Sequence, residues 1–421
     1  MTKHRTSSNR AEKSQVLPCS PAEGGEVGGL SPAPLPPCGR VEGRGVLVSL
    51  VGGQSMPNIL AALQYAPAEA VFLTTSASRY AYEDTKAVLE NRGIRCRPVK
   101  VSAYDMEEIE RACRTIAQEY RGKALVFNIT GGTKPMSIGA FLVAIQEGSR
   151  VIYVDTHQEQ ILHLHPRAPS ERMTGVIDVP TYLRAYGKEV TAAETEQDVD
   201  PEEVVLANWI GKEIAAMSRV LGKIRKWYGL GARGVVQIPY RGYKRAIAPI
   251  LQRLDESGYV TDLRDMGVHA SFRPSLDSGK RFFLCGGWLE LYVFAMASLC
   301  EFDDCRLGVH IRWNPKEDVA VSNELDVVMV RNHRLVICSC KTARQGSDTA
   351  HFFATHLSEL ETLKRHCGGP FASVLLITSS TIRRNRGVAR RAEELGIPII
   401  NPQRLPELKT MLERLEFAPG I

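Results

Sequence analysis

Short apolar runs alternate with helical patterns along the first part of the chain. The run at residues 46–51 ends in two glycines, and a helical pattern follows at residues 56–65. The same unit recurs downstream, with strands predicted at 70–74, 95–99, 124–129 and 150–155 and helices at 82–91, 106–120 and 135–147. Regular alternation of buried-type strands and helices is typical of a parallel sheet covered on both faces. We therefore expect a doubly wound, Rossmann-like α/β domain at residues 45–188.

A second α/β pattern, with a different order of elements, occupies residues 276–421. The predicted elements are a helix at 286–295, strands at 305–313, 324–331 and 334–340, a helix at 352–365, a strand at 372–378, a helix at 384–395 and a strand at 397–400. Three consecutive strands without intervening helices cannot all be parallel neighbours. The order predicts a mixed α/β core that is distinct from the first domain.

The chain between these patterns is less regular. Residues 189–203 are rich in acidic side chains and are interpreted as a linker. Helical patterns at 206–227 and 243–257 follow, and the second closes with a helix-to-strand step like that of a winged helix. We expect a small helical, winged-helix-like region at 204–275. Its aromatic residues are interpreted as core residues, with stacking on nucleic-acid bases as the alternative. They are Trp209, Trp227, Tyr228 and Tyr240.

Residues 1–44 contain proline-rich and glycine-rich stretches without hydrophobic periodicity and are predicted to be a disordered tail. The start of the chain also lacks the apolar core of a signal peptide.

Composition limits the class of protein. Apolar residues make up 44% and charged residues 24% of the chain. No apolar stretch approaches the roughly 18 residues that a membrane span needs, so we expect a soluble protein. The net charge of +6 permits a polyanionic partner without requiring one. The ten cysteines include no C-x-x-C pair, which disfavours a zinc ribbon and favours a reducing, cytoplasmic location.

Two glycine-containing loops follow predicted strands of the first domain, at residues 52–58 and 128–136. A glycine-rich turn that opens a helix offers backbone N–H groups to phosphates at the carboxyl edge of the sheet. Lys134 adds a positive charge, and Thr130 and Thr133 add hydroxyl groups. An anionic ligand is therefore favoured, although the glycines could serve only to close tight turns. Neither loop matches the phosphate-binding motifs of ordinary ATPases or dehydrogenases.

A hairpin in the second domain carries a group of charged residues. Side chains alternate along a strand, so Glu324 and Asp326 share one face, as do Ser339 and Lys341. A turn centred on Asn332 and His333 would place Asp326 opposite Ser339 and Glu324 opposite Lys341. Two carboxylates and an ammonium group at one spot suit phosphodiester hydrolysis with Mg²⁺ or Mn²⁺. The alternative is a strand that exposes a charged face to water.

The segment Asn128-Ile-Thr-Gly-Gly-Thr-Lys-Pro-Met136 resembles the signature of CARF domains, the Rossmann-like sensors of CRISPR systems. The resemblance implies a two-fold dimer whose paired loops enclose a cyclic oligoadenylate. It also implies the residues that bind this ligand. These are Gly53, Gln54, Ser55, Thr75, Ser76, Thr130, Gly132, Thr133 and Lys134.

The charged hairpin resembles the core of PD-(D/E)xK nucleases. Glu290 matches the helix carboxylate of that family, which implies catalytic roles for Glu290, Glu324, Asp326 and Lys341 and metal binding by the three carboxylates. Ser339 departs from the pattern, because the family has Asp or Glu at this position and serine is a poor metal ligand.

The order of these motifs resembles that of the CARF–PD-(D/E)xK CRISPR ancillary nucleases. The resemblance implies a homodimeric, allosteric endonuclease that cyclic tetra-adenylate activates to cut DNA, RNA or both in antiviral defence. Two alternatives remain: an inactive sensor that binds nucleic acid as a regulator, and a CARF pocket that cleaves its own ligand.

Overall fold

The computed structural model describes residues 45–313, 321–342, 349–380 and 386–415. The predicted tail at residues 1–44 lies outside these residues, as do the first two residues of the helix predicted at 384–395.

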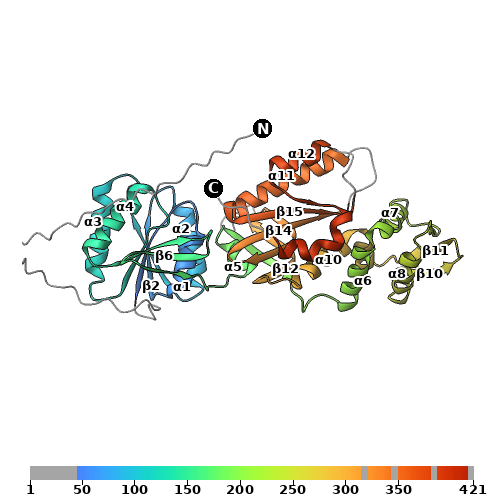
Figure 1. Ribbon diagram of the computed structural model, residues 1–421, viewed down its shortest axis with the longest axis horizontal. Coiled ribbons are helices and arrows are strands. Elements are labelled where there is room, and N and C mark those ends of the chain that lie inside the picture. The colour runs from blue at the N-terminus through green and yellow to red at the C-terminus, as the bar shows by residue number, and fades with distance from the viewer. Residues whose placement is uncertain (1–44, 314–320, 343–348, 381–385, 416–421) are drawn as a thin grey trace, which may run out of the picture. The chain divides into compact units, whose positions relative to one another are not determined.

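The N-terminal domain is built on a seven-stranded sheet with the order β3-β2-β1-β4-β5-β6-β7 (Figure 1). Strands β1 to β5 are parallel, which confirms the predicted Rossmann-like domain. Antiparallel β6 and β7 extend the sheet beyond its five parallel strands. The strands are β1 Val46–Leu50, β2 Glu69–Thr74, β3 Arg95–Lys100, β4 Leu125–Asn128, β5 Arg150–Asp155, β6 Gln160–His165 and β7 Ala168–Arg172.

Helices cover both faces of this sheet. Figure 1 shows α1 and α2 on one face and α3 and α4 on the other. Neighbouring residues of β1 divide between the two cores: Leu47 packs with residues of α1 and α2, and Val48 packs with residues of α3 and α4. These helices are α1 Met56–Tyr65, α2 Arg79–Glu90, α3 Met106–Glu119 and α4 Lys134–Gln146, and a short helix, α5 Val179–Arg184, follows the sheet.

The middle region contains three helices and a three-stranded antiparallel sheet with the order β10-β11-β9. The predicted step from α8 into β10 is present, whereas the helix expected at 206–227 is two helices that meet at Glu213. Trp227, Tyr228 and Tyr240 are buried, which supports their interpretation as core residues, while Trp209 is 41% exposed. The elements are α6 Pro201–Lys212, α7 Ile214–Gly229, β9 Val236–Pro239, α8 Lys244–Glu256, β10 Val260–Asp265 and β11 His269–Pro274.

The C-terminal domain is built on a six-stranded sheet with the order β16-β15-β14-β13-β12-β8. Its strands are β8 Lys188–Glu194, β12 Asp304–Trp313, β13 Ser322–Arg331, β14 Arg334–Lys341, β15 Ala372–Thr378 and β16 Ile399–Ile400. Its helices are α9 Ser278–Phe282, a π-helical turn at Phe283–Gly287, α10 Trp288–Ser298, α11 Thr349–Cys367, α12 Arg386–Glu394 and α13 Leu408–Glu413.

Strand β8 corrects the interpretation of residues 189–203 as a linker. It pairs antiparallel with β12 and forms an edge of the C-terminal sheet, and α6 already begins at Pro201. The acidic residues concealed this strand because an edge strand can direct charged side chains to solvent while its backbone completes the sheet.

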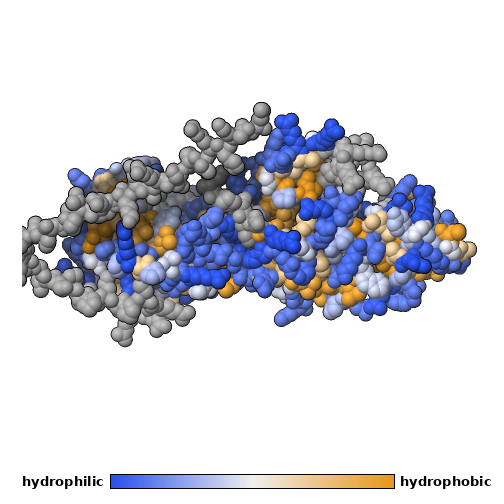
Figure 2. Space-filling view, viewed as in Figure 1, coloured by the Kyte–Doolittle hydropathy of each residue, from blue (hydrophilic) through white to orange (hydrophobic). Residues whose placement is uncertain are grey.

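Hydrophilic side chains dominate the face that Figure 2 shows, with smaller apolar areas among them. One apolar area lies over the β10–β11 end, where Met266 and Val268 are exposed. In the part of the chain that the structure describes, no helix combines the length and hydropathy that crossing a membrane requires.

Candidate functional sites

The two predicted ligand loops of the N-terminal domain meet at the switch point of its sheet. They follow β1 and β4, which are neighbouring parallel strands whose helices pack on opposite faces. Only glycine fits where the loops touch: a Cβ atom on Gly131 would lie 2.2 Å from the Leu50 carbonyl oxygen, and one on Gly52 would lie 2.9 Å from the Gly132 nitrogen. Ligands bind at such switch points in open α/β sheets.

A cavity of about 510 Å³ lies beside these loops. Three lining residues, Ser55, Ser78 and Thr133, are the N-caps of α1, α2 and α4. The positive ends of three helix dipoles therefore border one cavity, together with backbone N–H groups of the glycine loops. This arrangement favours an anionic ligand.

The cavity includes five of the nine residues that the CARF resemblance implied: Gly53, Ser55, Thr75, Gly132 and Thr133. The remaining four, Gln54, Ser76, Thr130 and Lys134, are not among its lining residues.

Two of the residues outside the cavity have structural partners. The Thr130 hydroxyl donates to the Asn128 side-chain oxygen at 2.6 Å and accepts from the Val154 N–H at 2.7 Å, so it ties β4 to β5. The Gln54 side-chain oxygen accepts a hydrogen bond from the Tyr186 hydroxyl at 3.2 Å.

Sequence reasoning missed Tyr80 and Asp84, which line the same cavity from α2. Tyr80 is 84% exposed, and no motif or spacing in the sequence distinguishes it from an ordinary surface tyrosine.

The hairpin of the C-terminal domain has the predicted turn. Asn332 and His333 both have positive φ angles, of 51° and 61°, and Arg331 pairs with Arg334. A two-residue turn with both central residues in this conformation matches the twist of the flanking strands. The ladder between β13 and β14 runs in the predicted register as far as Val327 and Cys338.

Asp326 and Lys341 form an ion pair just beyond the last paired residues of this hairpin. Lys341 Nζ lies 3.0 Å from Asp326 Oδ2, which also accepts from the Cys340 N–H at 2.6 Å and the Ser339 hydroxyl at 3.3 Å. Burial disfavours the charged ammonium, but the facing Asp326 carboxylate outweighs it and raises the pKa of Lys341. Lys341 is therefore held in place as an ammonium group.

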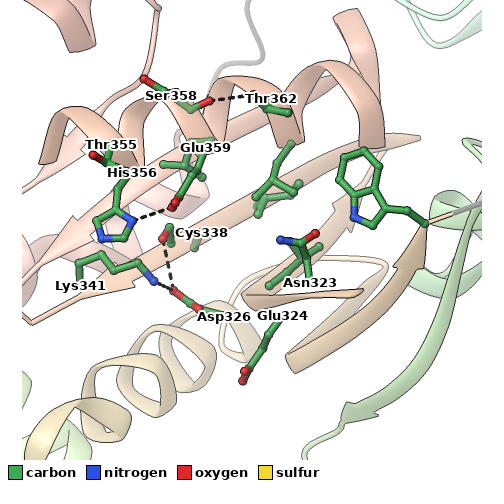
Figure 3. A pocket seen from close by; sticks show the side chains of 16 residues that line it. Asn323, Glu324, Asp326, Cys338, Lys341, Thr355, His356, Ser358, Glu359 and Thr362 are labelled. Carbon is green, nitrogen blue, oxygen red and sulfur yellow. Dashed lines mark hydrogen bonds and ion pairs between the residues drawn. The ribbon is translucent and has the colours of Figure 1, made fainter. Parts of the chain in front are cut away.

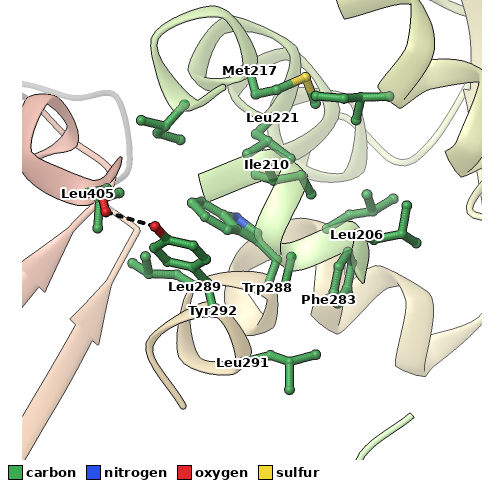
Figure 4. Close-up of a cluster of buried hydrophobic side chains, with 14 of the residues drawn as sticks. Leu206, Ile210, Met217, Leu221, Phe283, Trp288, Leu289, Leu291, Tyr292 and Leu405 are labelled. Carbon is green, nitrogen blue, oxygen red and sulfur yellow. Dashed lines mark hydrogen bonds between the residues drawn. The ribbon is translucent and has the colours of Figure 1, made fainter. Parts of the chain in front are cut away.

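Glu290 approaches this pair from α10. Burial, with a smaller contribution from the Asp326 carboxylate, raises the pKa of Glu290 to about 8. The first turn of α10 is firmly anchored, because Trp288 and Tyr292 are buried against α6 and α7 and the Tyr292 hydroxyl donates to the Leu405 carbonyl at 2.7 Å (Figure 4). Glu290 is thus a half-buried acid on a rigid helix that is electrostatically coupled to Asp326, and like charges in such a place are costly unless a proton or a cation separates them.

Glu324 lines the same cavity as Asp326 and Lys341, but it is exposed and lies opposite His310 of β12. Figure 3 shows its carboxylate directed away from the Asp326–Lys341 pair. The structure therefore brings the three predicted residues to one cavity, with an ion pair between Asp326 and Lys341. No cluster of three or more histidine, cysteine, aspartate or glutamate residues with metal-binding geometry occurs among the described residues.

The donors that are present still fit Mg²⁺ or Mn²⁺. Mg²⁺ is usually held by one or two carboxylates, with water and substrate phosphate completing its shell. Asp326 and Glu290 are the two carboxylates that could hold such an ion.

A cavity of about 420 Å³ opens between this sheet and α11 (Figure 3). Asp326, Ser339 and Lys341 line it from the strands, and α11 contributes His356 and Glu359. His356 was not singled out from the sequence, since a histidine on an amphipathic helix gives no distinctive signal.

Comparison with protein families identifies both domains. Residues 46–182 match the family model of the Card1 CARF domain, and residues 277–418 match that of the Card1-like endonuclease domain. No match was found among curated protein sequences.

Solved structures with a similar fold cover nearly the whole chain. Protein VC1899 from Vibrio cholerae has a TM-score of 0.70 and 21% identity, with 90% of this chain and 99% of that chain covered. Can2 from Sulfobacillus thermosulfidooxidans, in complex with cyclic tetra-adenylate, has a TM-score of 0.70 and 19% identity over 88% of this chain and 99% of that chain. A type III CRISPR defence DNA nuclease activated by cyclic oligoadenylate has a TM-score of 0.51 and 19% identity, covering 79% of this chain and 45% of that chain.

Proposed function

Because the chain belongs to the CARF-domain proteins that carry a Card1-like endonuclease domain, we propose that it is a metal-dependent endonuclease activated by cyclic oligoadenylate in type III CRISPR defence. The observation that carries this proposal is the Asp326–Lys341 pair at the edge of a 420 Å³ cavity, with Glu290 beside it.

Cyclic tetra-adenylate is the proposed activator. The cavity bordered by the N-termini of α1, α2 and α4 suits the phosphates of such a ligand. Can2, a protein of the same fold, has been solved with cyclic tetra-adenylate bound. A ring with two-fold symmetry would be enclosed by two copies of this cavity, so the active form is proposed to be a homodimer.

The nuclease site is proposed to act on a phosphodiester held against β13 and β14. A divalent cation held by Asp326 and Glu290 would polarise the phosphate and stabilise negative charge at the reacting phosphorus. Lys341, oriented by Asp326, would donate to a phosphate oxygen and counter the charge that develops there. The Ser339 hydroxyl would help to fix the Asp326 carboxylate rather than bind the cation.

Activation follows if the ligand binds one dimer arrangement more tightly than another and that arrangement admits nucleic acid to the nuclease sites. A ligand shifts such an equilibrium only by its difference in affinity for the two states.

The decisive experiment incubates the purified full chain with labelled single-stranded DNA, single-stranded RNA and supercoiled plasmid. Each substrate is tested with Mg²⁺ or Mn²⁺, with and without cyclic tetra-adenylate. Cleavage that requires both ligand and metal is the expected result, and the substrate that is cut defines the specificity.

Ser339 favours a second candidate function, an inactive sensor that binds nucleic acid as a regulator. The hydroxyl of Ser339 stands where the PD-(D/E)xK pattern has a carboxylate, so the site has one fewer potential metal ligand. Tight ligand binding without cleavage of any substrate would favour this function over the nuclease.

A further inference from the structure

Helix α11 forms the wall of the nuclease cavity opposite the strands that carry Asp326 and Lys341. His356 and Glu359 line the cavity from this helix, and neither has a part in the proposed reaction so far. Figure 3 shows the His356 side chain directed from α11 toward the strands, on the same side of the cavity as Lys341.

The imidazole of His356 is held in one orientation. Its Nδ1 atom lies 2.8 Å from Glu359 Oε2, and its ring packs edge to face against Phe352 with centroids 4.4 Å apart. The His356 side chain is 19% exposed, whereas that of Glu359 is 59% exposed. A carboxylate bound to one ring nitrogen keeps a proton there and leaves the other nitrogen, Nε2, to interact with a ligand.

The orientation of the His356 imidazole suits a role in the reaction. An in-line displacement at phosphorus places the attacking and leaving oxygens on opposite sides of the phosphate. The groups proposed to stabilise the attack, Asp326 and Lys341, occupy the strand wall. The leaving oxygen would then face α11, where His356 is the lining side chain best suited to donate a proton near neutral pH and Glu359 is the carboxylate able to stabilise the imidazolium.

We propose that His356 is the general acid of the reaction and that Glu359 is its positioning residue. Both roles rest on the proposed nuclease function. A water oxygen forms a bond to phosphorus as the bond from phosphorus to the 3′ oxygen breaks. The attacking water releases one proton to solvent. The proton on His356 Nε2 passes to the 3′ oxygen, which leaves as a hydroxyl, and the imidazole afterwards regains one proton from solvent.

Charged groups from three elements line the cavity around His356: Glu359 on α11, Asp326 and Glu324 on β13, and Lys341 on β14.

The test compares the wild-type full chain with His356→Ala on two single-stranded oligonucleotides of the class that the wild type cuts, with cyclic tetra-adenylate and Mn²⁺ present. One substrate has ordinary phosphodiesters, and the other has sulfur in place of the 3′ bridging oxygen at a single position. Thiolate leaves without needing a proton. His356→Ala should therefore cut the ordinary substrate about 10²-fold more slowly than wild type but cut the sulfur-containing linkage at close to the wild-type rate.

Two further variants sharpen the result. Glu359→Gln should show a smaller loss of the same kind, because the imidazole remains but its orientation is weakened. His351→Ala replaces an exposed histidine on the same helix and should leave both rates unchanged.

Normal cutting of the ordinary substrate by His356→Ala would overturn the inference. So would an equal loss on both substrates, which is the mark of a merely structural role. If the wild-type protein cuts neither substrate, the proposed nuclease function itself fails, and this inference fails with it.

Discussion

The cavity of the N-terminal domain and the cavity beside α11 differ in what their shape depends on. The first cavity is bordered by glycine loops and helix N-caps. Its shape depends on tight packing of backbone against backbone, such as that of Gly131 against the Leu50 carbonyl. The second is lined by charged side chains that hold one another, with Asp326 at the centre. A steric change should therefore damage the first site most, and a change of charge should damage the second.

The largest effect is expected from Lys341→Ala in the nuclease cavity. Removal of the ammonium group takes away charge stabilisation at the phosphate, so cleavage should fall by about 10²–10³-fold. Ligand binding, measured by calorimetry, should stay at the wild-type level because it belongs to the other domain. Lys409→Ala, which alters a lysine on α13, is the matched control. Persistent wild-type cutting by Lys341→Ala would exclude the role given to it.

Gly131→Ala should have the next largest effect, on the N-terminal domain. The new methyl group would overlap the Leu50 carbonyl oxygen, and moving that backbone should cost roughly 2–4 kcal/mol of stability. We expect a lower Tm and weaker binding of cyclic tetra-adenylate. Gly53→Ala is the matched control for stability, because a Cβ atom there has no neighbour within 4 Å. Equal Tm values for the two variants would contradict the steric account.

Glu290→Gln tests the acid on α10 that is coupled to Asp326, through the pH dependence of stability. The pKa of Glu290 is raised to about 8, so its contribution to stability is full at low pH and is lost as the pH rises through that value. In metal-free buffer, the Tm of wild type should therefore fall relative to Glu290→Gln by several degrees between acid and alkaline pH.

Glu301→Gln changes an exposed glutamate of the same domain and serves as the control for Glu290→Gln. If the Tm difference between wild type and Glu290→Gln does not change with pH, the pKa of Glu290 is not raised to about 8.

Ser339→Ala should have the smallest effect. It removes one of three donors to Asp326, at 3.3 Å, and leaves the Cys340 N–H and Lys341 in place. Loss of one long hydrogen bond to a carboxylate, worth about 1.5 kcal/mol, corresponds to roughly a tenfold slower cleavage at most. A loss as large as that of Lys341→Ala would mean that Ser339 takes part in the chemistry directly.

The sequence by itself determined the elements and the loops. Period-two and helical patterns placed most of the helices and strands, and the Asn332–His333 turn set the register that brings Asp326 opposite Ser339. The segment of residues 128–136 identified the sensor loop, because glycine is required wherever two backbones approach as closely as here. All of these signals are local, since each depends on residues only a few positions apart.

Only the tertiary structure decided which side chains share a cavity. Glu324 and Asp326 line one cavity, yet Figure 3 shows the Glu324 carboxylate directed away from Asp326, and Thr130 bonds to Asn128 and Val154 instead of lining the ligand cavity. Strand β8, hidden in an acidic segment, joins the C-terminal sheet only because β12 offers it a free edge. His356 reaches the nuclease site from a helix that follows the hairpin, so its position depends on packing between distant elements, which no local pattern encodes.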